Sequence, residues 1–194
     1  MFRRCWLVKL ASILSIYLAA STDGSTMIDI AALLIFPLAM TYAAFSDLFT
    51  MTISNWISLL LVVAYLVLAF AVGLSWQDMA WAFACGALVL VITFGMFCAG
   101  WMGGGDAKLA AASAIWLGWA HVMNYGLVAS VFGAVLTLAI ISIRRWPLPA
   151  FLTRYDWVLR LHDQREGIPY GIALALAGLY IYPQSQIWLA TSNM

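Results

Sequence analysis

Two aspartates stand out in this sequence because so few charged residues accompany them. Only 9% of the 194 residues are charged. Asp106 follows three consecutive glycines, Gly103, Gly104 and Gly105, and Asp47 closes an apolar run earlier in the chain. Glycine allows positive φ and the close approach of another chain, which suits the surroundings of a reacting peptide. The plainer alternatives are a glycine-rich turn whose aspartate starts a helix, and an ordinary loop acid at Asp47.

The chemistry open to such a pair is acid–base catalysis by two carboxyl groups. Two carboxylates a few ångströms apart do not both ionise easily, so one of them keeps its proton near neutral pH. The ionised member can take a proton from water while the protonated member polarises a carbonyl group. This route to peptide hydrolysis needs no metal and no cofactor.

Composition places these acids in a membrane protein. Hydrophobic residues make up 65% of the chain, which contains 10 tryptophans, and such a chain cannot cover its core as a water-soluble globule. Apolar runs of about 20 residues favour membrane-spanning helices over barrel strands. The net charge of +1, with no basic cluster outside one loop, argues against a nucleic-acid partner. The cysteines Cys5, Cys85 and Cys98 have no paired spacing and are expected to be small buried residues.

The expected fold is all-α, a polytopic membrane bundle of six helices with a candidate seventh segment at the N-terminus. The expected spans are residues 30–46, 55–73, 79–98, 107–123, 125–143 and 170–189. Residues 1–26 form either a signal-like segment or an extra span, with Met27 as an alternative start. Residues 27–194 then form a single transmembrane domain that carries both acids.

The distribution of basic residues predicts the orientation of this bundle. Cytoplasmic loops of membrane proteins carry the excess of lysine and arginine, and residues 144–165 hold five arginines. Counting spans back from this segment places the loops at Asp47 and Asp106 on the same cytoplasmic side. All nine basic residues fall on that side if the N-terminal segment also spans the membrane, so the two acids are expected to meet at its cytoplasmic edge. His121 and His162 fall on different sides, and neither can complete a triad or a metal site with the acids.

Three motifs occur in a fixed order along this topology. Asp47 is followed by Ile53 and Asn55, Gly103–Asp106 read GxGD and continue into Lys108-Leu109, and residues 168–171 read Ile-Pro-Tyr-Gly before the last span. Together they resemble the motifs of the type IV prepilin peptidase family, whose members are GxGD membrane aspartic proteases. The resemblance implies that Asp47 and Asp106 are catalytic and that Gly103, Gly104 and Gly105 form the active-site loop.

The resemblance also implies an activity and its partners. The expected reaction is cleavage of the leader peptide of a type IV prepilin or pseudopilin at the cytoplasmic face of the bacterial inner membrane, with no cofactor. The substrate has a short basic leader followed by an apolar helix that stays in the bilayer, and it must be extended at the cleaved bond. Membrane lipid and the pilus or secretion machinery are the other expected partners.

Two departures from the family pattern refine this expectation. Residues 48–52, just after Asp47, are uncharged, whereas family members often carry basic residues there. Larger members have an N-terminal methyltransferase region with paired CxxC motifs, for which this chain has neither the length nor the cysteines. It resembles the short, peptidase-only members that serve Flp-type (tight-adherence) pili, so N-methyltransferase activity is not expected.

Five further residues are candidates for supporting roles around the acids. The Lys108 ammonium group could hold Asp106 ionised or could simply mark a helix start that faces the cytoplasm. Asn55 could donate a hydrogen bond near Asp47 or cap the second span. Pro169, Tyr170 and Gly171 are expected to form a helix entrance close to the site.

Residues 150–166 predict an amphipathic helix on the inner membrane surface. Its apolar residues recur at helical spacing, with arginines and acids on other faces. The arginines are expected to meet anionic lipid. Candidates for binding a basic leader are Asp156, Asp163 and Glu166.

A second class of function stays open on sequence grounds. A non-catalytic membrane transporter, or an assembly subunit of a pilus or secretion system, could use Asp47 and Asp106 for proton handling. Acids that conduct protons usually lie near the middle of the bilayer, whereas these two are expected at one edge.

Overall fold

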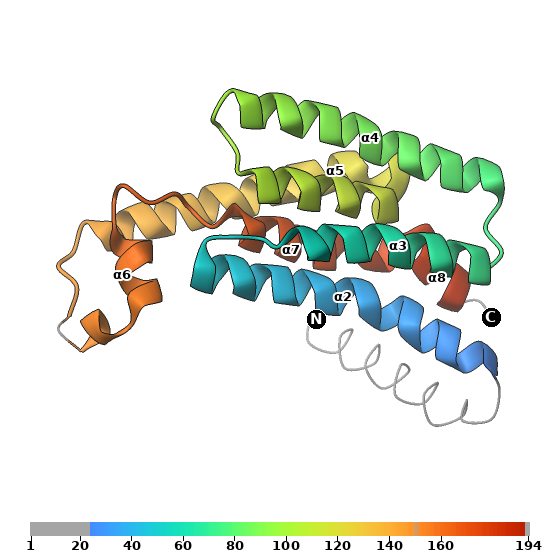
Figure 1. The fold of residues 1–194 in the computed structure, drawn as a ribbon, viewed down its shortest axis with the longest axis horizontal. Coiled ribbons are helices and arrows are strands. Elements are labelled where there is room, and N and C mark those ends of the chain that lie inside the picture. Colours follow the sequence, from blue (N-terminus) through green and yellow to red (C-terminus); the bar gives the residue numbers. More distant parts are fainter. Residues whose placement is uncertain (1–23, 150, 193–194) are drawn as a thin grey trace, which may run out of the picture.

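The computed structural model describes residues 24–149 and 151–192, which form an all-α bundle without a β-strand (Figure 1). The helices are α2 (Gly24–Thr50), α3 (Asn55–Ala71), α4 (Trp76–Cys98), α5 (Gly104–Arg144), α6 (Asp156–His162), α7 (Tyr170–Ile181) and α8 (Gln186–Ser192), with 3-10 turns η1 (Leu152–Arg154) and η2 (Tyr182–Gln184). The expected all-helical class is confirmed. Residues 1–23, which make up most of the expected N-terminal segment and include Cys5, lie outside the described residues.

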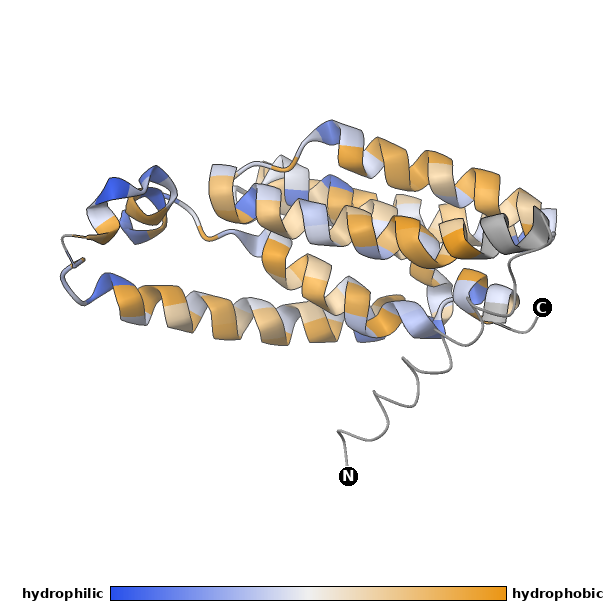
Figure 2. Cartoon of the chain, turned by 90° about the horizontal axis from the view of Figure 1, so that it is seen from below, coloured by the Kyte–Doolittle hydropathy of each residue, from blue (hydrophilic) through white to orange (hydrophobic). Residues whose placement is uncertain are grey.

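The bundle has the apolar surface of a membrane protein. Within the described residues, Ile30–Thr50, α4 and α5 are long and apolar enough to cross a membrane, and α3 is a shorter apolar helix. Figure 2 shows apolar residues all around these helices and hydrophilic residues gathered at the loops and at α6. Large apolar side chains such as Leu38, Val67, Val91 and Leu138 are more than half exposed. A surface of this kind is stable against lipid but not against water.

Gly118 divides α5 into two helices. Its backbone has φ 65° and ψ −179°, a conformation that is essentially restricted to glycine. Residues 104–117 run away from Asp106 to the far end of the bundle, where Trp119 Nε1 donates a hydrogen bond to the Trp81 carbonyl oxygen at 2.9 Å. Residues 119–144 then return and extend past the bundle towards α6 (Figure 1). Two helices were expected here, but the predicted boundary near Asn124 is wrong, because the chain reverses at Gly118.

The last expected span, residues 170–189, is not one continuous helix. The α7 helix ends at Ile181, the η2 turn contains Pro183, and α8 begins at Gln186. Proline lacks an N–H donor, and its ring clashes with the carbonyl of the preceding turn. The segment is therefore a helix–turn–helix, which corrects the prediction.

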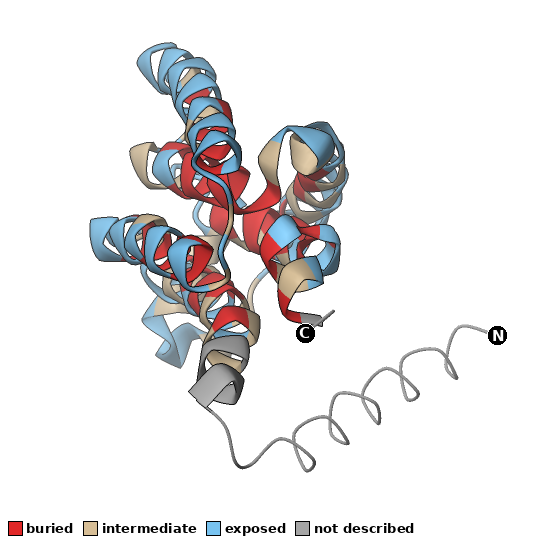
Figure 3. Cartoon of the chain, turned by 90° about the vertical axis from the view of Figure 1, so that its right-hand side faces the viewer, coloured by how far each residue is buried: buried red, intermediate tan, exposed pale blue. Residues whose placement is uncertain are grey.

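Two helices form the centre of the bundle, namely the first part of α5 and α7. Ala107 and all residues from Leu109 to Leu117 are buried, as are most residues of α7. Figure 3 shows the buried faces of the surrounding helices turned inward. Both central helices are rich in alanine and other small residues, which allow neighbouring backbones to approach closely.

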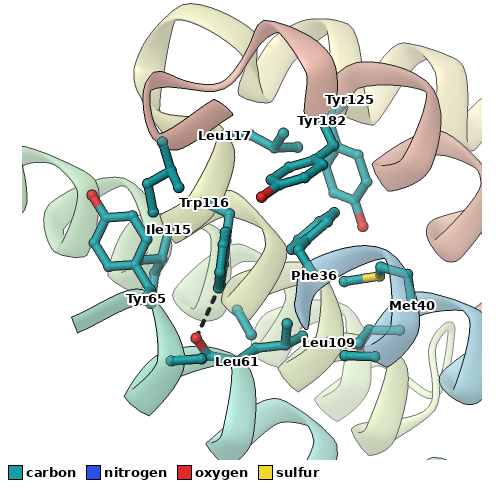
Figure 4. Packing of buried hydrophobic residues seen from close by; sticks show 14 of the residues in the cluster. Phe36, Met40, Leu61, Tyr65, Leu109, Ile115, Trp116, Leu117, Tyr125 and Tyr182 are labelled. Atoms are coloured by element: carbon teal, nitrogen blue, oxygen red, sulfur yellow. Dashed lines mark hydrogen bonds between the residues drawn. The ribbon is translucent and has the colours of Figure 1, made fainter. Parts of the chain in front are cut away.

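An aromatic cluster fixes the end of the bundle away from Asp106 (Figure 4). Trp116 packs against Phe36 on α2, Tyr65 on α3 and Tyr182 in η2, with ring centroids 5.2, 5.8 and 5.9 Å away. Trp116 Nε1 also donates to the Leu61 carbonyl oxygen at 2.9 Å. Each aromatic pair contributes about 0.5–1.5 kcal/mol beyond the area that it buries. The cluster thereby sets the relative orientation of the helices whose other ends form the candidate site.

The hairpin between α5 and α7 contains the predicted surface helix in a shorter form, α6. The α6 helix has no buried residue, and it contacts the C-terminal end of α2. Arg160 Nη2 donates to the Phe49 carbonyl oxygen at 2.5 Å, and the rings of Trp157 and Phe49 lie 5.5 Å apart. Arg160 thus contacts the main chain of this protein, where a lipid contact was expected.

The two described cysteines differ in burial. Cys85 is buried as expected, whereas Cys98 is exposed in the last turn of α4, so that prediction is wrong. Cys98 lies where α4 leaves the bundle for the glycine-rich loop, and no other helix covers it there.

Candidate active site

Asp47 lies in the last turn of α2 and faces the N-terminus of α7. Its side chain is only 5% exposed. Its Oδ2 atom accepts a hydrogen bond from the Gly171 N–H at 2.7 Å. Gly171 is in the first turn of α7, where N–H groups lack partners within their own helix. The positive end of α7 therefore offsets the unfavourable position of an acid at the C-terminal end of α2.

Asp106 lies in the first turn of α5 and is half-buried. An acid in the first turn of a helix interacts favourably with the helix dipole. Its Oδ1 atom is buried and has no hydrogen-bond partner among the described residues. Asp106 is also one of the residues that line a cavity.

Ile53, in the loop between α2 and α3, brings the segments of the two acids together. A Cβ atom on Gly105 would lie 3.0 Å from Ile53 Cβ and 3.2 Å from the Ile53 carbonyl oxygen. A Cβ atom on Gly171 would lie 2.6 Å from Ile53 Cδ1 and 2.8 Å from Asp47 Oδ2. Both glycines thus pack directly on Ile53, so the segments of Asp47 and Asp106 meet at this side chain.

The other glycines of the loop also make close contacts. Gly103 is the N-cap of α5, and a Cβ atom there would lie 3.0 Å from Asp106 Oδ2. A Cβ atom on Gly104 would lie 3.3 Å from the Phe97 ring. The three consecutive glycines therefore let the start of α5 approach its own acid, α4 and Ile53 at once.

Lys108 and Asn55 join the starts of α5 and α3. Lys108 Nζ donates to Asn55 Oδ1 at 2.8 Å. The N-cap of α3 is Ser54, whose side chain accepts from the Trp56 N–H, so of the two roles considered for Asn55 the capping role is excluded. The described residues contain no ion pair between Lys108 and Asp106. The lysine instead links the first turns of α5 and α3, next to the loop that contains Ile53.

The entrance to α7 lies beside Asp47, where the sequence predicted it. Pro169 is fully buried and is the N-cap of α7. The Tyr170 ring packs on Gly133, and its hydroxyl group lies 3.3 Å from Thr137 Oγ1. The second part of α5 therefore holds the residue that precedes Gly171.

A cavity of about 1020 Å³ lies beside Asp106. Its walls come from α4, from both parts of α5, from residues 100–103 and from the entrance to α7. Most of the lining is apolar or small, including Val89 and Met96 on α4 and Gly126 and Ala134 on α5. The charged residues in its lining are Asp106, Arg144 and Glu166. This pattern of an apolar wall with a few polar groups suits an apolar chain whose reactive group reaches Asp106.

The described residues contain no cluster of three or more His, Cys, Asp or Glu side chains that could hold a metal ion. Two carboxyl groups converge instead, one held by a helix N-terminus and one with a free oxygen. Both acids and all three loop glycines are residues that the sequence had singled out as candidates. The sequence contained no indication of the hydrogen bonds of Arg144. For the contacts of Ile53, its only indication was that both residues that touch this side chain, Gly105 and Gly171, are glycines.

Comparison with known proteins adds a family to this helical membrane fold. The sequence model of the type IV leader peptidase family matches residues 34–138, which is more than half of the chain. The matched region includes Asp47, Ile53, Asn55 and the Gly103–Asp106 loop. The chain belongs to the type IV leader peptidase family.

Curated relatives resemble a limited part of the chain. The prepilin leader peptidase/N-methyltransferases of Aeromonas salmonicida (strain A449) and Aeromonas hydrophila are each 36% identical over 77 residues. That alignment covers 40% of this chain and 21% of each relative. No solved structure matches the chain.

Proposed function

We propose that this protein is an aspartic endopeptidase that removes the leader peptide of type IV prepilins at the cytoplasmic face of the bacterial inner membrane. The observation that carries the proposal is the convergence of Asp47 and Asp106 around Ile53, within the region that matches the leader peptidase family. Family membership supports prepilin processing, and the paired carboxyl groups support the aspartic mechanism. The arginine-rich segment beyond α5 supports the cytoplasmic orientation.

The two acids are suited to different roles. The Gly171 N–H favours the charged form of Asp47, so Asp47 is the better acceptor for a proton from water. Asp106, whose Oδ1 atom is free, is the better donor to the carbonyl oxygen of the cleaved bond. The water oxygen attacks the carbonyl carbon as Asp47 takes one proton and Asp106 gives one. The tetrahedral intermediate then collapses, and a proton passes to the leaving nitrogen.

The cavity provides room for the substrate. Its apolar walls between α4 and the second part of α5 suit the apolar segment of a prepilin, and Glu166 in its lining suits a basic leader. The cavity is lined by residues 100–103 and by Asp106, so an extended peptide that lies along the glycine-rich loop reaches this carboxyl group. On the same grounds of resemblance, the protein serves Flp-type pili as a peptidase without N-methyltransferase activity.

Proton handling by a transporter or an assembly subunit is less well supported. Both acids lie at one end of the bundle, and the cavity wall beyond Asp106 is largely apolar. A proton pathway through the membrane needs polar groups or water along its length.

The test uses the full chain in lipid nanodiscs with a purified prepilin. Asp47→Asn and Asp106→Asn should each abolish cleavage, because an amide can neither accept the proton of water nor replace a carboxylic acid. Asp78→Asn, at the other end of the bundle, should cleave normally. Chelators and reagents directed at serine or thiol groups should have no effect. Full processing by either amide variant of the pair, or inactivation by a chelator, would contradict the proposal.

A further inference from the structure

We propose that Arg144 is a positioning residue that keeps the Gly171 N–H on Asp47. The inference deepens the proposed function and rests on it, because it concerns how the carboxyl pair is held. Arg144 is the last residue of α5 and lies far from Asp47 in the sequence. Its link to the acid runs through the main chain between α6 and α7.

Within residues 24–149 and 151–192, Arg144 makes three hydrogen bonds, and all of them go to main-chain oxygens. Its Nε atom donates to the Leu161 carbonyl at 2.8 Å, and its Nη2 atom donates to the carbonyls of Glu166 and Gly167 at 3.2 and 3.1 Å. Leu161 lies in the last turn of α6, where carbonyl groups lack partners within the helix. The planar guanidinium group fixes these acceptors relative to one another, as a lysine ammonium group cannot.

The clamped segment leads directly to the candidate site. Only Ile168, Pro169 and Tyr170 separate Gly167 from Gly171. Proline fixes its own φ and restricts the residue before it, so a shift at Gly167 passes on to the start of α7. Gly171 then has little freedom, because it packs against both Ile53 and Asp47.

The same helix holds this segment from the other side of Pro169. Tyr170 packs on Gly133 and lies within hydrogen-bond distance of Thr137. Gly133, Thr137 and Arg144 share one face of the second part of α5, since they follow one another at one and two helical turns. This face is therefore a scaffold for the main-chain donor of Asp47.

Arg144 also borders the cavity, so a direct contact with substrate is the competing explanation. The neighbouring Arg145 provides a matched control. It carries the same charge and is exposed, and its side chain has no hydrogen bond in the described part of the chain. A positioning role predicts a loss in kcat, whereas a substrate contact predicts a rise in KM.

The experiment compares Arg144→Lys, Arg144→Gln and Arg145→Gln as full chains in nanodiscs. Hydrogen exchange of the peptide that contains Gly171 should be faster in both Arg144 variants and unchanged in Arg145→Gln. With a purified prepilin, kcat should fall roughly ten- to hundredfold in both Arg144 variants, with little change in KM. The acidic limb of their pH–activity profile should move to higher pH, because Asp47 loses a donor to its charged form.

Wild-type exchange and kinetics in Arg144→Lys would overturn the inference, as would a rise in KM alone. If Arg144→Lys does not accumulate in the membrane, Gly133→Ala is tested in its place. This variant displaces the same segment through Tyr170 and changes no charge. Unchanged hydrogen exchange at Gly171 in that variant would overturn the inference. Failure of the proposed function is distinguishable, since the wild type would then leave prepilin uncut while the exchange data still report the coupling of Arg144 to Gly171.

Discussion

At Gly171 the main chain of α7 touches both the Asp47 carboxyl group and Ile53. An alanine Cβ atom there would lie 2.8 Å from Asp47 Oδ2 and 2.6 Å from Ile53 Cδ1, closer than side-chain atoms pack. We therefore expect Gly171→Ala to lower kcat by about tenfold or more, because the acid must move away from its reactive position. The measurement is prepilin cleavage by purified protein, together with its abundance in the membrane.

Gly95→Ala is the control for this substitution. Gly95 lies inside α4, and a Cβ atom there would have no neighbour within 4 Å. Alanine is the better helix former, so this variant should keep full activity and equal or higher stability. Wild-type activity in Gly171→Ala would show that the start of α7 does not position Asp47.

The hydrogen bond between Lys108 and Asn55 links helices that each border the candidate site. If the bond positions the loop of Ile53, Lys108→Met and Asn55→Ala should each reduce activity, and the double variant should be no worse than the more impaired single one. The measurement is a double-mutant cycle on kcat in nanodiscs.

The same cycle tests the other role considered for Lys108. If its positive charge favours the ionised form of Asp106, Lys108→Met should move the alkaline limb of the pH profile to higher pH, because the proposed proton donor then keeps its proton longer, whereas Asn55→Ala should leave the profile unchanged. Strictly additive losses would contradict the positioning role, because residues that act through one bond do not add.

The reversal inside α5 depends on the backbone of Gly118. With φ 65° and ψ −179°, this residue has a conformation that alanine adopts only under strain. We expect Gly118→Ala to lower the free energy of unfolding by about 1–3 kcal/mol. Thermal unfolding in detergent measures this, with Gly126→Ala on the same helix as the control. An unchanged Tm in Gly118→Ala would show that the chain turns without this conformation.

The sequence is sufficient to predict the helices that begin and end at polar or glycine-rich loops. It places the reversal near Asn124 and not at Gly118, because residues 107–143 are apolar almost throughout and hydropathy does not mark the residue at which the chain turns. The turn depends on the positive φ angle of Gly118. The sequence does not distinguish this glycine from the other glycines of the same apolar run. The break at Pro183 was missed for a related reason, since the apolar run continues past it.

The residues of the candidate site also differ in how far the sequence predicts them. Asp47, Asp106 and the loop glycines were predictable because their chemistry lies in their side chains or in the lack of one. The partners that hold the site are main-chain groups, such as the Gly171 N–H and the carbonyl oxygens that Arg144 contacts. Every residue except proline has a main-chain N–H group and a carbonyl group. Hydrogen bonds to these groups therefore cannot be recognised from residue types.

The orientation of the whole molecule depends on α5 crossing the membrane twice. If its 41 residues formed one continuous span, the Asp106 loop and the arginine-rich hairpin would lie on opposite faces. Reversal at Gly118 instead brings both towards the same end of the molecule, which the excess of basic residues predicts to face the cytoplasm. The reversal also places Trp119 beside Trp81, at the start of α4.

Reporter fusions along the full chain test this topology. Fusions after Trp101 and within residues 154–165 should report the cytoplasm, and fusions near Gln77, at Trp119 and after Ser192 should report the opposite side. The fusion at Trp119 is the most informative, because a cytoplasmic signal there would mean that residues 104–117 do not cross the membrane. Asp47 and Asp106 on opposite faces would rule out a shared carboxyl pair, because no packing of the helices could then bring the two acids to one peptide bond.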